Sequence, residues 1–246
     1  GTIMLAELAR ARPDGLTIRE LTETLAMPRS TVYRILSTLE PRGVVHRGSS
    51  GAYVLGAKLV ELAGSVTDGA GYDLVEIASP HLERLSAELG EARKISVRDG
   101  DAVLVLATRS GSHAYGLTIA PGRKLPFHAG AASKVLMAHL EPPEIERLLG
   151  QELHAFTPRT ITDPKKLRAE LARIRRDGWS VDKGEYSHLV RAYAAPVVDP
   201  HARVIAAVSI PFLNDKEPDR EEAIRQGVIR TAGAISEALP ARGGKR

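Results

Sequence analysis

Hydrophobic residues in the first part of the chain recur at helical spacing. Apolar positions return every three or four residues along three segments: 2–11, 17–26 and 29–41. Thr17 and Glu20 stand at the spacing of a capping box, which marks the start of the second segment. The spacing therefore predicts three amphipathic helices joined by short turns.

The third predicted helix has a distinct inner and outer face. Its apolar residues follow one helical stripe and must face inward: Val32, Ile35, Leu36 and Leu39. Its polar residues must then face outward: Arg29, Ser30, Tyr33, Arg34 and Ser37. Short extended runs at 44–47 and 52–55 follow, and the Gly-Ser-Ser-Gly stretch between them predicts a hairpin. This order of elements is typical of a winged helix-turn-helix.

Beyond this hairpin the pattern changes twice. Residues 57–69 favour a linker helix that ends in a glycine-containing stretch. Further helices are predicted at 72–89, 130–140, 142–149, 164–177 and 219–238. Strands are predicted at 92–98, 102–108, 114–119, 179–186, 190–198 and 203–212. Strand pairs flanked by helices indicate an α+β fold with an antiparallel sheet.

The chain is thus expected to consist of four parts. Residues 1–56 form the winged helix-turn-helix and 57–69 the linker helix. Residues 70–240 form the α+β domain, and 241–246 a disordered tail.

Charge is spread unevenly along the chain, although the net charge is only +4. Residues 1–60 hold eight Lys and Arg against five Asp and Glu, whereas 61–240 hold 23 against 25. The last six residues add three positive charges. A basic module beside a near-neutral one fits phosphate binding by the basic module. An excess of three charges also falls within ordinary scatter, so charge alone leaves the partner open.

Composition excludes several classes of protein. Cysteine is absent, which rules out disulfides, thiolate catalysis and cysteine-based zinc sites. No apolar run approaches the roughly 18 residues of a membrane span, and no secretory signal stands at the start. The hydrophobic fraction of 43% and the charged fraction of 26% are ordinary for a globular protein. We therefore expect a cytoplasmic protein.

The outer face of the third predicted helix carries groups that suit DNA. In a helix-turn-helix this helix enters the major groove with its N-terminal residues leading. The residues in that position are Arg29, Ser30, Thr31, Tyr33 and Arg34. Arginine can bind a guanine edge or a phosphate, and hydroxyls reach either. His46 and Arg47 of the hairpin can follow an adjacent backbone or minor groove. The alternative is a small helical bundle with a solvated polar face.

Seven motifs follow one another along nearly the whole chain. The first three are Gly-Leu-Thr-Ile-Arg-Glu-Leu (15–21), Met-Pro-Arg-Ser-Thr-Val-Tyr-Arg-Ile-Leu (27–36) and Tyr-Val-Leu-Gly (53–56). Next are Leu-Pro-Phe-His-Ala-Gly-Ala-Ala-Ser-Lys (125–134) and Thr-Pro-Arg-Thr-Ile-Thr-Asp (157–163). The last two are Gly-Trp-Ser-Val-Asp-Lys-Gly-Glu-Tyr (178–186) and Val-Arg-Ala-Tyr-Ala-Ala-Pro-Val (190–197). With these motifs in this order, the chain resembles the IclR family of bacterial transcriptional regulators.

The resemblance implies a winged helix-turn-helix, a linker helix and a GAF-like effector-binding domain. It implies homodimers, often paired into homotetramers, on inverted-repeat operators, because a two-fold symmetric protein requires a palindromic site. Effectors in this family are mostly small organic acids, including aromatic acids. The expected function is a ligand-responsive repressor of transcription, with double-stranded DNA and an acid effector as partners and no cofactor.

The resemblance also places an effector pocket in the larger domain. Carried over residue by residue, the pocket positions are Leu117, Leu125, Ala131, Ala132, Asp182, Val190, Ala192 and Ser209. The two alanines begin a predicted helix, whose free N–H groups and dipole suit a carboxylate; packing against the sheet is their alternative role. Many relatives have a cysteine where Ala192 stands and a serine near Pro211. We therefore expect a roomier, less polar pocket that favours an aromatic or larger acid over a two- or three-carbon acid.

Catalysis and metal binding are alternatives for the larger domain. Ser133 and Lys134 offer a nucleophile and a base, but neighbouring helical residues diverge by about 100° and do not easily pair. Asp182, Glu185 and His188 offer three metal ligands only if a turn gathers them. We expect neither an enzyme nor a bound metal. The hypotheses left open are an architectural DNA binder without a ligand, and a small-molecule-binding or catalytic protein whose N-terminal bundle mediates protein contacts.

Overall fold

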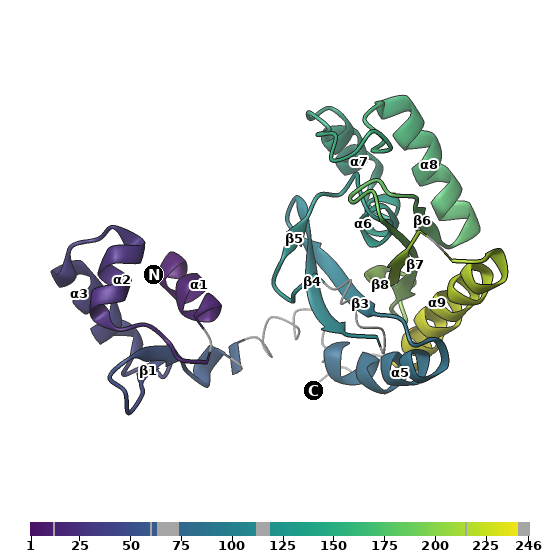
Figure 1. The fold of residues 1–246 in the computed structure, drawn as a ribbon. Coiled ribbons are helices and arrows are strands. Elements are labelled where there is room, and N and C mark those ends of the chain that lie inside the picture. The colour runs from purple at the N-terminus through teal and green to yellow at the C-terminus, as the bar shows by residue number, and fades with distance from the viewer. Residues whose placement is uncertain (12, 60, 63–73, 112–118, 215, 241–246) are drawn as a thin grey trace. The chain divides into compact units, whose positions relative to one another are not determined.

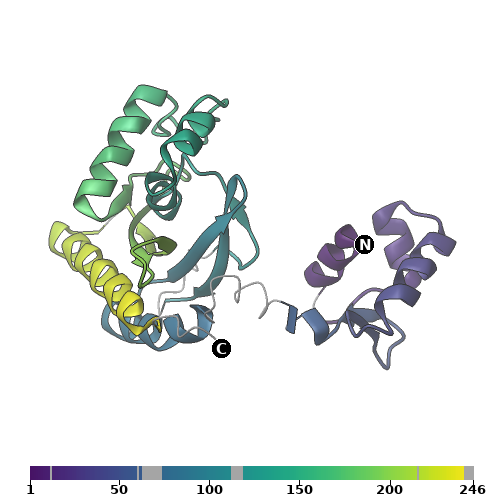
Figure 2. The same cartoon turned by 180° about the vertical axis from the view of Figure 1, so that it is seen from behind.

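The computed structural model describes residues 1–11, 13–59, 61–62, 74–111, 119–214 and 216–240 (Figure 1; Figure 2). It contains two compact units, Gly1–Gly71 and Tyr72–Arg246. The predicted pocket residue Leu117, the tail 241–246 and most of the strand at 114–119 lie outside the described residues. Of the predicted linker helix, residues 58–59 and 61–62 are described and helical. None of the described helices is long and apolar enough to cross a membrane.

The first unit is a three-helix bundle with a hairpin. Its elements are α1 (Thr2–Arg10), α2 (Ile18–Leu25), α3 (Arg29–Leu39), β1 (Val45–Arg47) and β2 (Tyr53–Leu55). The two strands pair antiparallel. The buried core consists of Met4, Leu8, Ile18, Leu21, Val32, Leu36, Val45 and Tyr53. The predicted winged helix-turn-helix is therefore confirmed.

Local signals fix the bounds of α2 and α3. Thr17 Oγ1 accepts the backbone N–H of Glu20, and the Glu20 carboxylate accepts the N–H of Thr17 at 2.7 Å, so the predicted capping box is confirmed. Ala26 ends α2 in the left-handed region, with φ of +49°. The third helix ends at Leu39, slightly earlier than expected, because the N–H of Val44 turns back onto the Leu39 carbonyl.

The second unit is an α+β domain around one six-stranded antiparallel sheet, as predicted. The sheet order is β5-β4-β3-β8-β7-β6. The strands are β3 (Arg93–Asp99), β4 (Ala102–Arg109), β5 (Lys124–Leu125), β6 (Ser180–Asp182), β7 (Val190–Val198) and β8 (Val204–Leu213). The helices are α5 (Leu74–Leu89), α6 (Ala131–Ala138), α7 (Pro142–Leu149), α8 (Pro164–Asp177) and α9 (Pro218–Ala238).

Helices cover both faces of this sheet (Figure 1; Figure 2). On one face, Ala194 of β7 and Ala207 of β8 belong to the core shared with α6 and α8. On the other face, the Tyr193 hydroxyl donates to Glu221 of α9, and the Tyr193 ring stacks on Phe212. Strands β7 and β8 are therefore buried on both sides, which explains why their sequences are almost continuously apolar.

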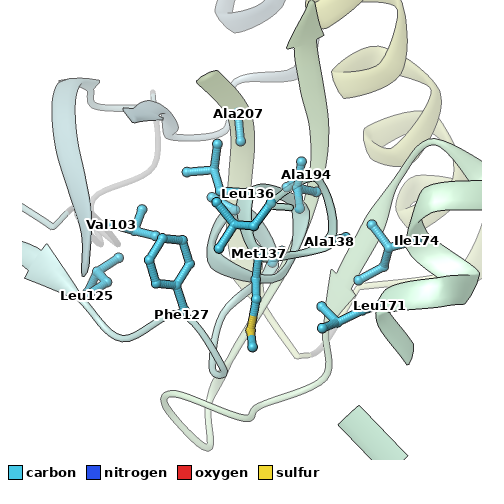
Figure 3. Packing of buried hydrophobic residues seen from close by; sticks show 14 of the residues in the cluster. Val103, Leu125, Phe127, Leu136, Met137, Ala138, Leu171, Ile174, Ala194 and Ala207 are labelled. Atoms are coloured by element: carbon cyan, nitrogen blue, oxygen red, sulfur yellow. The ribbon is translucent and has the colours of Figure 1, made fainter. Parts of the chain in front are cut away.

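A hydrophobic core of the second unit lies around α6 (Figure 3). Leu136, Met137 and Ala138 of α6 contribute to it together with Leu171 and Ile174 of α8. The sheet contributes small residues such as Ala194 and Ala207, which allow α6 to lie close to the strands. The first turn of α6 is thereby held against the sheet.

Most of the predicted elements of this unit are confirmed, and two differ. Helix α8 and strand β7 begin and end at the predicted residues. The strand predicted at 179–186 is wrong beyond Asp182, because Asp182 Oδ1 accepts the N–H groups of Gly184 at 2.8 Å and Glu185 at 2.6 Å and turns the chain. Strand β5 was not predicted, since two residues carry no period.

Candidate functional site

Helix α3 presents the polar face that its sequence predicts. Val32 and Leu36 are buried, and Ile35 and Leu39 pack partly buried against the same core. The residues that face away from that core are Arg29, Ser30, Tyr33 and Arg34, all exposed, and Thr31, half-buried. The Pro28 carbonyl accepts the N–H groups of Thr31 and Val32. The helix therefore begins at Arg29, the first of these side chains.

Within this face two residues are already arranged as a pair. The guanidinium carbon of Arg29 lies 5.7 Å from the centre of the Tyr33 ring. Arg34, one turn further along, is exposed, and its side chain has no hydrogen bond among the described residues. Arg34 is therefore free to bind a base edge or a phosphate.

The hairpin Arg47 is exposed but partly held. Its Nε donates to the carbonyl of Gly51 at 3.2 Å, and its guanidinium carbon lies 5.9 Å from the centre of the Tyr53 ring. His46 next to it is also exposed. These contacts fix Arg47 along the hairpin, where it can bind a phosphate with its remaining N–H groups.

A cavity of about 250 Å³ lies in the second unit between the sheet and the start of α6. Seven of the eight predicted pocket residues line it: Leu125, Ala131, Ala132, Asp182, Val190, Ala192 and Ser209. The eighth, Leu117, is outside the described residues. The structure thus brings together residues that the sequence spreads over 85 positions, from Leu125 to Ser209.

The lining also contains residues that were not predicted. They are Lys94, Ile119, Ala129, Gly130, Ser133, Tyr186, Ser187 and Pro211. One of them, Lys94, belongs to a strand that carries several other polar and charged residues, so the sequence offered no signal that this lysine is buried.

Hydrogen-bond donors converge on the cavity without partners of their own. The first N–H groups of any helix lack intrahelical acceptors, and Ala131 and Ala132 stand in that first turn of α6. Ser133 Oγ and Ser209 Oγ are buried and have no hydrogen-bond partner among the described residues. Buried polar atoms without partners are rare in proteins, so this arrangement suits a bound ligand that accepts hydrogen bonds.

The cavity contains one basic and one acidic side chain. Lys94 is 8% exposed, and burial lowers its pKa to about 8, against the opposing effect of Asp182. Asp182 is 4% exposed, and burial raises its pKa, although the N–H groups of Glu185 and Gly184 and the charge of Lys134 oppose that rise.

A second buried basic residue, Lys134, lies next to the cavity, and its ammonium group has three hydrogen-bond acceptors. Lys134 Nζ donates to Glu185 Oε1 at 2.6 Å, to the Val181 carbonyl at 2.8 Å and to Glu170 Oε1 at 3.3 Å. Burial raises the pKa of Glu185 to about 7. Lys134 therefore stabilises the fold and is not placed as a base for Ser133.

The carboxylates weighed above as metal ligands are engaged in other contacts. Asp182 binds backbone N–H groups and Glu185 binds Lys134. Within the described part of the chain, no three His, Asp or Glu side chains are grouped so that they could hold a metal ion.

Two family models match the chain. The model for the IclR helix-turn-helix domain matches residues 4–49, and the model for the C-terminal part of bacterial transcriptional regulator IclR matches residues 69–237. Together these matches cover both structural units.

Curated proteins and solved structures agree with the models. The Bacillus subtilis transcriptional regulator KipR is 32% identical over 226 residues, which cover 89% of this chain and 90% of KipR. The Escherichia coli transcriptional repressor IclR is 31% identical, with 85% of this chain and 77% of that protein covered. An IclR homologue from Microbacterium hydrocarbonoxydans, crystallised with 4-hydroxybenzoate, is 27% identical with a TM-score of 0.81, and 96% of each chain is covered.

These matches argue against the hypothesis that the chain is an enzyme, because these similar proteins are named as transcriptional regulators and residues 4–49 match a helix-turn-helix model. The chain belongs to the IclR family of bacterial transcriptional regulators, and it is a DNA-binding regulator rather than an enzyme.

Proposed function

We propose that the protein is a repressor that binds an inverted-repeat operator through α3 and responds to an organic acid bound in the cavity beside α6. The observation that carries the ligand response is the cavity itself: buried, unpartnered hydroxyls of Ser133 and Ser209 face the same space as the first turn of α6. Such a space is suited to a carboxylate.

The DNA-binding half of the proposal rests on the exposed face of α3. A single helix reads only a few base pairs, so regulators of this architecture bind as symmetric dimers to two half-sites. We infer a homodimer or homotetramer for this chain, which acts on chromosomal DNA in the cytoplasm. The residues that meet the DNA are Arg29, Ser30, Thr31, Tyr33, Arg34 and Arg47.

The effector is proposed to be a small aromatic acid. A dry cavity of about 150 Å³ can hold benzene, so the 250 Å³ available here is enough for a single ring with its carboxylate. Ala192 and Pro211 keep this wall apolar. The homologue with 4-hydroxybenzoate provides a precedent for a ligand of that size in the same fold.

The experiment that tests the proposal measures DNA binding with and without acids. Full-length protein is titrated onto fluorescent DNA from upstream of its own gene, with glyoxylate, pyruvate, benzoate or 4-hydroxybenzoate present. We expect a specific complex on a palindromic segment and a change of affinity with an aromatic acid. Deletion of the gene should raise transcription from the bound promoter.

The experiment tests DNA binding through α3, the response to an acid and the aromatic nature of the acid separately. No preference for any palindromic duplex over random DNA would overturn the regulator mechanism through α3. Specific DNA binding that no acid alters would favour an architectural protein. Strongest binding of glyoxylate or pyruvate would overturn the aromatic assignment.

A further inference from the structure

Lys94 is a buried cation without a direct hydrogen bond or ion pair among the described residues. It stands on β3, is 8% exposed and lines the cavity. Among the described residues, no acceptor forms a hydrogen bond or ion pair with its Nζ. Lys134, the other buried lysine beside the cavity, has three acceptors. Lys94 therefore differs from a lysine that stabilises the fold.

An ammonium group without a direct ion pair is costly in a protein interior, because it loses its hydration. For Lys94 the charge of Asp182 offsets only part of that cost, since the pKa stays lowered to about 8. A methionine or leucine at this position would pack the sheet without that cost. The cost is recovered if a ligand brings a negative charge into the cavity.

The position of Lys94 indicates where that charge lies. Lys94 is the register partner of Ser209 on β8, so the two side chains share the face of the sheet that α6 covers. Ser209 Oγ is unpartnered as well. A carboxylate at this place has the ammonium group, a hydroxyl and the first turn of α6 as binding groups.

Asp182 lies on the other side of the same cavity. Strands β8 and β7 stand between β3 and β6 in the sheet, so three strand spacings, about 14 Å, separate the two backbones. The two side chains still act on each other electrostatically. Asp182 Oδ1 is occupied by two backbone N–H groups, so its position is fixed. The cavity thus has a positive and a negative side.

We infer that Lys94 is the counterion of the effector carboxylate and that Asp182 restricts effectors to acids with a single carboxylate. This inference rests on the proposed function, since it assigns the chemistry of the same cavity. A second carboxylate would meet Asp182 at close range in a medium of low polarizability, where like charges repel strongly. A hydroxyl or amide group on that side would instead donate to Asp182.

The pKa of Lys94 gives the pairing a measurable consequence. A bound carboxylate raises a lysine pKa that burial has lowered to about 8. Binding above that pH therefore takes up a proton, and affinity falls as the pH rises above about 8. Asp182 faces Lys94 from β6, and Lys134 of α6 acts on Asp182 together with Glu185. Burial raises the pKa of Glu185 to about 7, so this carboxyl group titrates mainly below the pH at which Lys94 does.

The test is calorimetry on full-length protein with matched probes. Benzoate and pyruvate serve as monoanions, benzamide and pyruvamide as neutral amides, and terephthalate and oxaloacetate as dianions. The variants are Lys94→Met and Asp182→Asn, which remove a charge at nearly constant volume. Lys166→Met, on the exposed face of α8, removes a positive charge elsewhere in the same unit.

The wild type and the Lys166→Met control should bind at least one monoanion more tightly than its amide and its dianion. Lys94→Met should weaken binding of that monoanion about thirtyfold or more and leave the amide within about twofold. Asp182→Asn should selectively improve binding of the dianion. Proton uptake at pH 9, measured in two buffers, should disappear in Lys94→Met.

The outcomes separate this inference from the proposed function. A wild type that binds no carboxylate overturns both. A wild type that binds a monoanion while Lys94→Met binds it equally well overturns the counterion alone and leaves the acid-responsive regulator intact. Thermal unfolding supplies a readout without any ligand: Lys94→Met should melt at a higher temperature, and a lower one would indicate a structural lysine instead.

Discussion

At the scale of single residues, Lys94 makes the stability of the ligand-free protein depend on pH in a predictable direction. Burial lowers its pKa from 10.5 to about 8. Between these values the unfolded chain binds more protons than the folded one, so this residue makes folding more favourable as the pH rises. Its destabilising effect is complete below pH 8 and is lost as the pH approaches 10.5.

We therefore predict that Lys94→Met raises the free energy of unfolding at pH 7 by on the order of 3 kcal/mol. The advantage should shrink steadily between pH 8 and 10.5. Urea unfolding across this range measures both effects. Lys166→Met, which removes an exposed lysine, should show no such pH-dependent gain.

Arg34 is the residue on which DNA recognition depends most directly. It is exposed on α3, one turn beyond the residues that lead into the groove. We predict that Arg34→Ala weakens operator binding by about 1–3 kcal/mol if the guanidinium contacts a base. Fluorescence anisotropy on operator and random duplexes measures the loss and shows whether specificity falls with it.

The matched control for Arg34 is Arg42→Ala. Arg42 follows the C-terminal end of α3, away from the end that enters the groove, and donates to the Thr38 carbonyl. The same charge is removed from the same unit, so the two variants are matched in net charge and differ in the place of the lost guanidinium. Equal losses for the two variants would reduce Arg34 to a general phosphate contact.

At the scale of elements, hydrophobic periodicity predicted the long helices and strands. It did not predict element ends that depend on a single side-chain hydrogen bond. Helix α8 was predictable in full because Asp163 caps its start and Gly178 ends it in the left-handed region. Strand β6 was not, because its end depends on the Asp182 carboxylate. A turn made by one side chain leaves no period in the sequence.

The residues that line the cavity also fall into those that could be predicted from the sequence and those that could not. The family resemblance supplied seven of the residues that line it. Lys94 remained outside the prediction because a lysine in a strand is expected to face solvent. Its burial depends on β8 lying beside β3, a pairing between residues more than a hundred positions apart. The burial of Lys94 is therefore visible only in the folded sheet.

The turn between α2 and α3 offers a test of element stability. Ala26 adopts φ of +49°, which costs an L-residue about 1–2 kcal/mol. Glycine avoids that cost but loses about 0.5–1 kcal/mol of chain entropy. We predict that Ala26→Gly stabilises the first unit slightly, measured by slower hydrogen exchange in α2 and α3.

Ala11 is the control position for the same substitution, because its backbone is not in the left-handed region. It ends α1 with φ of −85°, which alanine adopts without strain. Ala11→Gly should therefore only lose entropy and make exchange in α1 faster. Faster exchange in α2 and α3 for Ala26→Gly as well would show that the left-handed turn stores no recoverable strain.

At the scale of the whole molecule, an acid in one unit can change DNA binding by the other only through a difference in affinity. The effector must bind differently to the DNA-competent and DNA-incompetent states, and the effect is reciprocal. A coupling of about 1–3 kcal/mol changes either affinity by roughly 5- to 150-fold. Operator DNA should therefore alter the affinity for the acid by the same factor as the acid alters the affinity for DNA.

Ala132→Leu isolates this coupling. Ala132 is 5% exposed in the first turn of α6 and lines the cavity, where a leucine side chain takes the place of the ligand. We predict that operator affinity without acid stays within about twofold of the wild type, while the acid no longer changes it. Arg34→Ala should behave in the opposite way, with weak DNA binding and unchanged affinity for the acid.

If Ala132→Leu instead lowers operator affinity as strongly as saturating acid does, the leucine side chain mimics the ligand, and filling the cavity is itself the signal. If the acid still acts on this variant, its site lies elsewhere in the molecule.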